Sequence, residues 1–203
     1  MQLVLASASP RRLQLLYQLG ITPLVEAAGV DEAVHPGEDP FEYVERVARA
    51  KCAAVAEGVP NVPVVAADTT VTIGGRILGK PKDDNEAVEM LVTLSGRTHD
   101  VLTAVAVGYG NKTESEIERT AVTFAELSVD DALWYVRTRE PMDKAGSYAI
   151  QGAGGTFVRS IEGSVDNVIG LPRHLTDSLL ARFGLRLLDF VDDPSQSPAT
   201  LYS

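Results

Sequence analysis

A group of serine and arginine side chains lies near the N-terminus of the chain. Ser7, Ser9, Arg11 and Arg12 belong to the stretch Ser-Ala-Ser-Pro-Arg-Arg, in which Ser9 suits a helix N-cap and proline suits the first helical position. Two arginines in a first helical turn oppose the helix dipole, and a bound anion would reverse that unfavourable interaction. Hydroxyl, guanidinium and free N–H groups at a helix start bind phosphate oxygens. We therefore predict a phosphate site here; the alternative is a pair of solvated arginines beside an ordinary cap.

Acidic side chains form the second candidate group. Asp68 follows a continuous apolar run over residues 62–67, which is typical of a buried strand. Open α/β sheets bind ligands at the carboxyl ends of such strands, so we expect Asp68 and Thr69 to lie in a ligand site. Glu32 also follows an apolar stretch and would supply a second carboxylate. The alternatives are an aspartate that caps a turn and a solvated glutamate.

Two lysines and one glutamine extend this set. Lys51 lies close to the apolar face of the helix predicted over residues 39–58, where its ammonium group either extends to solvent or binds an anion. Lys80 follows a glycine in a basic turn, and such turns are usually solvated. Gln151 stands between an isoleucine and a glycine. Its amide both donates and accepts hydrogen bonds, which suits the edge of a nucleobase; a bond to the backbone is the alternative.

Strands and helices must bring these side chains together. Apolar runs, alternating patterns and cap residues predict an α/β protein with a mixed sheet. Residues 1–188 are expected to form one domain and the Pro- and Ser-rich residues 189–203 a flexible tail. The predicted elements are strands over residues 2–6, 62–67, 101–109, 120–127 and 156–161, a hairpin over 71–78, and helices over 10–20, 39–58, 84–94 and 172–183 and from residue 128.

Composition excludes several classes of protein. A formal net charge of −10 disfavours a nucleic-acid partner, since such a surface repels a polyanion, while a small anion remains compatible where basic groups gather. The apolar runs are far shorter than the ~18 residues of a membrane span, so no membrane partner is expected. A single cysteine, Cys52, excludes an internal disulfide and a Cys/His zinc site. The N-terminus lacks the basic region of a signal peptide, which predicts a cytoplasmic location.

Ordered motifs along the chain resemble the Maf (septum-formation) family. They are SASPRR, the pair Asp31-Glu32, AADT, GKPKD, LSGRTHDV, DKAGSYAIQG and NVIGLP. The resemblance implies a fold like that of inosine triphosphatase, with a mixed twisted sheet flanked by helices and two lobes around a central cleft. It also implies hydrolysis of a nucleoside triphosphate to its monophosphate and pyrophosphate with a divalent metal, and it suggests a homodimer.

The same resemblance implies roles for particular residues. The aspartate of the family's ADT motif, which accepts the proton, falls on Asp68. Three positions that separate the branches of the family fall on Arg11, Thr69 and Gln151. This combination resembles the dTTP/UTP pyrophosphatase branch, because the 7-methyl-GTP branch typically has tryptophan and glutamate at the positions of Arg11 and Gln151.

Together these patterns predict attack of water on the α-phosphorus. An ordinary carboxylate and water differ in pKa by about 12 units, or roughly 16 kcal/mol, so a Mg²⁺ or Mn²⁺ ion held by Glu32 and Asp68 is expected to help. Two alternatives stay open: a pyrophosphatase for inosine or xanthosine triphosphate, and a non-catalytic nucleotide-binding regulator of division. The residues expected to bind the phosphates are Ser7, Ser9, Arg11, Arg12, Lys51 and Lys80.

Overall fold

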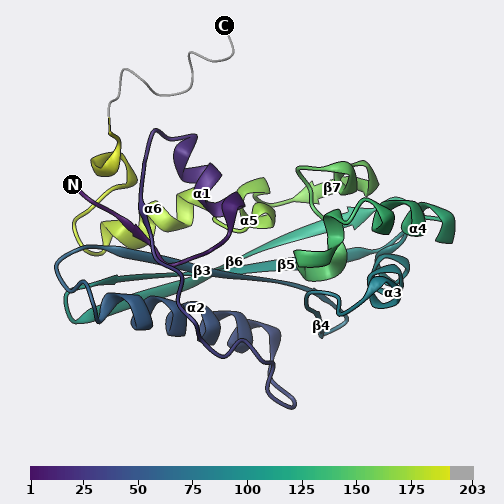
Figure 1. Ribbon diagram of the computed structural model, residues 1–203, viewed down its shortest axis with the longest axis horizontal. Helices are drawn as coiled ribbons and strands as arrows, with labels where there is room; N and C mark the ends of the chain where they lie inside the picture. Colours follow the sequence, from purple (N-terminus) through teal and green to yellow (C-terminus); the bar gives the residue numbers. More distant parts are fainter. Residues whose placement is uncertain (193–203) are drawn as a thin grey trace, which may run out of the picture.

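The computed structural model describes residues 1–192 and contains one mixed sheet. The strand order is β2-β1-β3-β5-β6-β7, and β4 pairs with β3. The first strand pairs in parallel with β2 and β3, whereas the other pairs are antiparallel. The predicted class, an α/β fold with a mixed sheet flanked by helices, is confirmed (Figure 1). The strands are β1 (Val4–Leu5), β2 (Leu24–Val25), β3 (Val64–Ile73), β4 (Arg76–Leu78), β5 (Thr98–Tyr109), β6 (Lys112–Phe124) and β7 (Val158–Glu162).

The helices begin at cap residues that the sequence signals. Asp39 accepts a hydrogen bond from Phe41 N at the start of α2, and Ser128 and Asp131 form a capping box at the start of α4. The α-helices are α1 (Pro10–Tyr17), α2 (Pro40–Ala56), α3 (Asp84–Leu94), α4 (Val129–Arg137), α5 (Val165–Ile169) and α6 (Arg173–Ala181). Short 3₁₀ helices are η1 (Glu140–Asp143), η2 (Ala145–Ser147), η3 (Ala153–Phe157) and η4 (Leu187–Phe190).

Helices cover both faces of the sheet's first half. Because side chains alternate along a strand, Val64 and Ala66 of β3 pack with α2, while Val65 and Ala67 pack with α1 and α6. Figure 1 shows α2 on one side of the strands and α1, α5 and α6 on the other. In this part of β3, even-numbered residues therefore face α2, and odd-numbered residues face α1 and α6.

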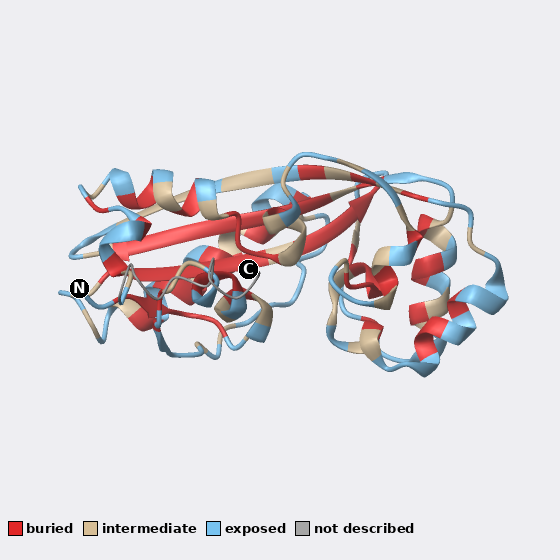
Figure 2. Ribbon diagram, turned by 90° about the horizontal axis from the view of Figure 1, so that it is seen from above, coloured by how far each residue is buried: buried red, intermediate tan, exposed pale blue. Residues whose placement is uncertain are grey.

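A second lobe forms at the far end of the long strands. There α3, α4 and the segments η2 and η3 pack around a separate core that includes Val71, Leu91, Phe124 and Tyr135. Figure 2 shows this lobe beside the main body, with buried strand segments running between the two. The two lobes expected from the resemblance are therefore present.

Two boundaries differ from the predicted ones. The polar residues 110–116 were expected to connect two strands, but β6 starts at Lys112, because a turn with Gly110 at φ +60° lets its polar residues pair with β5 while facing outward. The packed chain also passes residue 188: Phe190 is 3% exposed, and Asp192 N donates to Gly20 O. The rest of the predicted tail, residues 193–203, lies outside the described residues.

Within residues 1–192, no helix combines the length and apolar character that crossing a bilayer requires.

Candidate active site

A cavity of about 550 Å³ lies between the two lobes. Five cationic and three anionic side chains line it, although the formal net charge of the protein is −10. Basic groups therefore gather locally, as binding of a small anion requires. The structure brings together all the residues that the sequence suggested for the site, and the lining includes Ser7, Ser9, Arg11, Arg12, Glu32, Lys51, Asp68, Thr69, Lys80 and Gln151.

The cavity opens where β3 lacks a neighbouring strand on one side within residues 1–192. The strand β1 pairs with β3 only as far as Val65, and β4 joins it only from Val71 onward. Asp68 and Thr69 lie in this interval, while β5 pairs with them from the other side. The expectation that a strand ends at Asp68 is therefore wrong: β3 continues because β5 continues beside it, and the open edge of β3, rather than its end, exposes Asp68 to the cavity.

Because side chains alternate along β3, Asp68 and Thr69 lie on opposite faces of the sheet and contact different partners. Asp68 shares the α2 face and meets Lys51 of that helix. Thr69 shares the opposite face and meets Arg12 of α1. Since both residues also line the cavity, a ligand at the open edge of β3 can reach groups from both faces of the sheet.

Lys51 joins the two carboxylates of the site. Its Nζ lies 2.8 Å from Glu32 Oε1 and 2.8 Å from Asp68 Oδ1. Burial would raise the pKa of Glu32, but the hydrogen bond and charge of Lys51, with smaller contributions from Lys80 and Arg12, hold that pKa below its ordinary value. The resulting cluster keeps the two carboxylates side by side at the cavity wall.

Arg12 is a buried cation whose hydrogen bonds all go to neutral oxygens. Its Nε donates to Gly170 O at 2.8 Å, Nη1 to Ser7 Oγ at 3.0 Å and Nη2 to Thr69 Oγ1 at 3.1 Å. Burial lowers its pKa, and the charge of Asp68 opposes that shift. In residues 1–192 no carboxylate forms an ion pair with this guanidinium, and its remaining N–H groups are available to an anionic ligand.

The hydroxyl groups around Arg12 have defined roles. Ser7 Oγ accepts from Arg12 and from Ser9 N, so its own O–H is left to donate to a ligand. Ser9 is the N-cap residue of α1, as predicted, but its hydroxyl makes no cap bond. Thr69 Oγ1 accepts from Arg12 and lies 2.9 Å from Thr103 Oγ1; because Thr103 donates to Asn167 O, Thr69 is the donor in that pair.

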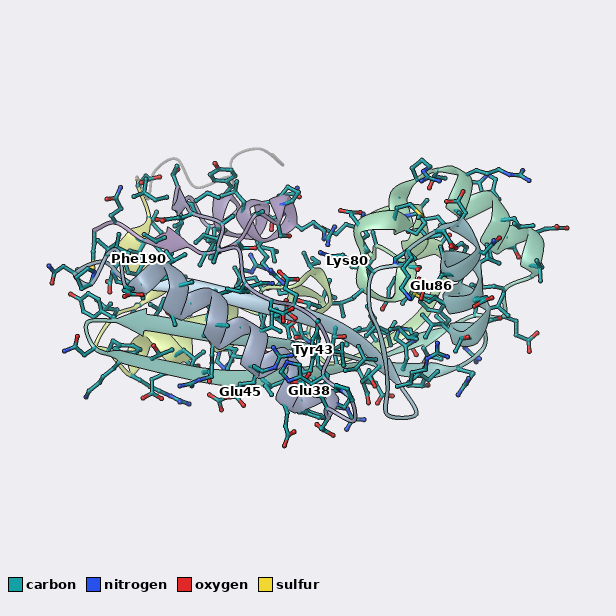
Figure 3. The ribbon with its side chains drawn as sticks, turned by 60° about the horizontal axis from the view of Figure 1, so that its bottom comes forward. Glu38, Tyr43, Glu45, Lys80, Glu86 and Phe190 are labelled. Atoms are coloured by element: carbon teal, nitrogen blue, oxygen red, sulfur yellow. The ribbon has the colours of Figure 1, made fainter. Side chains whose placement is uncertain are left out.

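The mouth of the cavity carries charges from both lobes. Arg11 Nη1 of the first lobe lies 3.7 Å from Asp143 Oδ2 of the second. Lys144 Nζ in turn contacts Asp143 Oδ1 at 2.5 Å and Glu140 O at 2.6 Å. Exposed Lys80 lies at the opening between the lobes (Figure 3). These cations are close enough to the cavity to meet the end of a polyanion.

Hydrogen bonds from Arg46 and Tyr43 of α2 hold the loop that carries Glu32. Arg46 bonds both carboxylate oxygens of Glu38, at 2.6 and 2.9 Å, and donates to Ala33 O at 2.9 Å. Tyr43 OH donates to Glu32 O at 3.2 Å, and Figure 3 shows Tyr43 and Glu38 close together on this side of the molecule. The hydrogen bond from Arg46 lowers the pKa of Glu38 to about 2. The loop is therefore tied to the helix that also carries Lys51.

Four residues that line the cavity were not among the site residues predicted from the sequence. Asp143, Lys144 and Tyr148 lie within the quoted motif DKAGSYAIQG, but nothing in their spacing shows that they face the first lobe. Tyr43 precedes Lys51 by about two helical turns, and that spacing places both on one side of α2. Burial, with the charges of Asp68 and Glu32, raises the pKa of Tyr43 to about 12, so its phenol is a neutral donor.

His99 lies outside the cavity lining and is a buried structural residue. It is 2% exposed, its Nε2 lies 2.9 Å from Tyr148 OH, and its ring packs edge-on against Phe124 and Tyr148. Burial lowers its pKa to about 4, with the charge of Asp100 opposing.

The low pKa of His99 predicts a loss of stability in mild acid. Its pKa is 6.5 in the unfolded chain and about 4 in the folded one, so between these values the unfolded state binds more protons and stability falls as pH falls. The free energy of unfolding is expected to drop by about 2 kcal/mol from pH 7 to pH 4.5 on account of this residue. Urea denaturation at both pH values measures it. In His99→Phe, which keeps an aromatic ring, the pH dependence should shrink by that amount; an unchanged dependence would contradict the assignment.

Fold and cavity together define a class of protein. It is an α/β protein with a mixed sheet, and the cleft between its lobes combines three carboxylates with five cationic side chains, which suits a small polyanion. A family model described as "Maf-like protein" matches residues 2–183. The chain belongs to the Maf family.

Curated relatives cover nearly the whole chain. It is 54% identical over 185 residues to a protein of Myxococcus xanthus (strain DK1622), a match that spans 91% of this chain and 94% of that protein. It is 46% identical over 191 residues to a protein of Neisseria meningitidis serogroup B, spanning 91% and 95%. Both relatives are named dTTP/UTP pyrophosphatase. Among solved structures, the Ham1 protein of Staphylococcus aureus aligns with 17% identity over 62% of this chain and 73% of that chain, with a TM-score of 0.40.

Proposed function

We propose that this protein hydrolyses nucleoside triphosphates, dTTP and UTP among them, to the monophosphate and pyrophosphate. The observation that carries the proposal is the single cavity in which Arg12, Lys51 and Lys80 meet Glu32 and Asp68. Two curated relatives named dTTP/UTP pyrophosphatase support the choice of pyrimidine nucleotides. The proposal places the enzyme in the cytoplasm, where such nucleotides occur, and expects a homodimer from the family resemblance alone.

Arg12 and Ser7 would bind the phosphates. Three N–H groups of Arg12 are held by Gly170, Ser7 and Thr69, so the guanidinium plane is oriented before a ligand arrives. Its free N–H groups and the Ser7 O–H then point to the same cavity. Preorganised donors of this kind stabilise charge that develops on phosphate oxygens without reorganising during the reaction. Arg11 and Lys80 would neutralise the outer phosphates at the mouth.

Asp68 would accept the proton of the attacking water. Its Oδ1 is engaged by Lys51 at 2.8 Å, while its Oδ2 has no hydrogen-bond donor in residues 1–192. The bond to Lys51 fixes the plane of the carboxylate, which leaves Oδ2 to orient and deprotonate water beside the α-phosphorus. Lys51, which also contacts Glu32, keeps the two carboxylates together despite their repulsion.

Glu32 and Asp68 fit a divalent cation by the chemistry of their donors. Both carboxylates line the cavity and converge on Lys51, and Mg²⁺ or Mn²⁺ is typically held by one or two carboxylates together with substrate phosphates. No group of three or more His, Cys, Asp or Glu side chains in residues 1–192 forms a metal cage, so phosphate oxygens would have to complete the ligand set. When bound, such an ion polarises water and neutralises phosphate charge.

Gln151 would select the base. Its side chain is exposed at the cavity and makes no hydrogen bond within the described residues. The imide edge of uracil or thymine presents a carbonyl, an N–H and a second carbonyl, and an amide can donate to one group and accept from the next. Thr69, which the resemblance associates with specificity, would act by holding Arg12 in place.

Gln151→Glu is expected to lower kcat/KM for UTP and dTTP by about 10²-fold or more. A carboxylate loses the amide donor and repels the base carbonyls, and unpaired polar groups in a recognition site are costly. Initial rates of pyrophosphate release with UTP, dTTP, CTP and GTP measure the change. Gln18→Glu introduces the same charge at an exposed position and should behave as wild type. Unchanged relative kcat/KM across the four nucleotides in Gln151→Glu would exclude this base contact.

A nucleotide panel with pyrophosphate detection tests the proposed activity itself. The panel contains dTTP, UTP, CTP, GTP, ITP and XTP, each assayed with Mg²⁺, with Mn²⁺ and with chelator. We expect monophosphate and pyrophosphate in equal amounts from dTTP and UTP, only with a divalent ion. Preference for ITP or XTP would replace the pyrimidine assignment, and nucleotide binding with no pyrophosphate at stoichiometric enzyme would indicate a non-catalytic protein.

A further inference from the structure

We infer that Tyr135 and Glu140 are positioning residues for base selection, because they hold both sides of the loop that presents Gln151. The inference rests on the proposed function, in which Gln151 contacts the base. Neither residue lines the cavity. Both would therefore act through the backbone of the loop rather than by touching the substrate.

Glu140 holds the loop after Gln151. Its Oε2 accepts a hydrogen bond from Ala153 N at 3.1 Å, and its Oε1 accepts from Gly154 N at 3.2 Å. Burial would raise the pKa of Glu140, but the bonds from Tyr135, Gly154 and Ala153 keep it below its ordinary value. The group is thus a carboxylate, which accepts on both oxygens and donates on neither.

Tyr135 holds the loop before Gln151. Its hydroxyl accepts from Ala149 N at 3.1 Å and donates to Glu140 Oε1 at 2.7 Å. The residue is fully buried in the core of the second lobe. Burial, and then the hydrogen bond to Glu140, raise the pKa of this phenol, so it stays a donor. One continuous chain of hydrogen bonds therefore joins Ala149 to Ala153 and leaves Gln151 between them.

The glycines of the loop admit this pair of side chains. A Cβ added to Gly152 would collide with the carboxylate of Glu140, and one added to Gly154 would lie 2.5 Å from Tyr135 OH. Only glycine allows the backbone to approach so closely. The loop therefore packs against Tyr135 of α4 and Glu140 of η1. Within residues 1–192, the amide of Gln151 in this loop makes no hydrogen bond.

The test compares Tyr135→Phe and Glu140→Gln with Gln151→Ala, alone and combined. Each single variant is expected to lower the UTP-to-CTP ratio of kcat/KM by roughly tenfold. The inhibition constant of inorganic tripolyphosphate, which has no base, should stay within about twofold of wild type. In the Gln151→Ala background neither substitution should change the ratio further. Glu162→Gln, an exposed acid on β7, is the matched control.

The outcomes separate this inference from the proposed function. If Gln151→Ala changes the ratio but Tyr135→Phe and Glu140→Gln do not, the positioning role is wrong and the base contact stands. If Gln151→Ala leaves the ratio unchanged, the base contact itself fails. If the two variants lower kcat/KM equally for every nucleotide and weaken tripolyphosphate binding, their role is structural only and the inference is overturned. Tyr135→Phe removes one oxygen and keeps the ring, so it supplies the result should Glu140→Gln fail to fold.

Discussion

Replacing Asp68 with asparagine is expected to lower kcat for UTP by about 10³-fold or more while nucleotide still binds. General-base catalysis contributes typically 10²–10⁴-fold, and an amide cannot accept the proton of water. The substitution keeps the shape of the side chain, and Lys51 retains Glu32 at 2.8 Å, so the buried ammonium group keeps a partner. The fold is therefore expected to survive.

Three measurements check this prediction for Asp68→Asn. Pyrophosphate release gives kcat, calorimetric titration with a non-hydrolysable UTP analogue gives Kd, and thermal unfolding gives Tm. Asp130→Asn, an exposed aspartate in the first turn of α4, is the control. A kcat within a few fold of wild type would remove Asp68 from the role of proton acceptor.

Replacing Arg12 with lysine is expected to lower kcat/KM by about 10²-fold or more, although the charge is kept. The guanidinium reaches Gly170, Ser7 and Thr69 through three different nitrogens. A lysine ammonium is a single point on a flexible stem, so it cannot hold these three oxygens and offer a fork to phosphate as well. The substitution also removes the N–H group from which Thr69 Oγ1 accepts a hydrogen bond.

The affinity for inorganic pyrophosphate shows whether the loss of kcat/KM in Arg12→Lys comes from lost phosphate binding. We expect both kcat/KM for UTP and the affinity for inorganic pyrophosphate to fall, since Arg12 would bind phosphate directly. Arg159→Lys, at an exposed position of β7, should change neither. If pyrophosphate binds Arg12→Lys as it binds wild type, Arg12 has no direct part in phosphate binding.

Local features of this protein could be predicted from its sequence. The N-cap at Ser9, the capping box of α4 and the start of α2 at Asp39 and Pro40 follow from residues within a few positions of one another. Contacts of this range depend on backbone geometry that neighbouring residues set. The sequence likewise predicted that basic and acidic groups would share one cavity, since the ordered motifs of a family carry its tertiary arrangement with them.

Other features depend on contacts between segments that are far apart in the chain. Asp68 lies on an open strand edge because β1 stops and β4 starts on either side of it, and no local pattern reports where a distant strand ends. Lys51 could have faced solvent, but burial beside Glu32 and Asp68 paired its charge. Polarity along β6 suggested a loop where a half-exposed strand pairs with β5.

The order of residues specifies which chemical groups are present, where helices begin and which residues are apolar enough to form a core. The tertiary structure decided which groups share a buried position, because strand pairing and lobe packing join residues far apart in the chain. The contacts of Tyr135 with Ala149 and of Glu140 with Ala153 show the difference. Each partner is ordinary in its own segment, and only folding of the second lobe around a common core brings them to the two sides of Gln151.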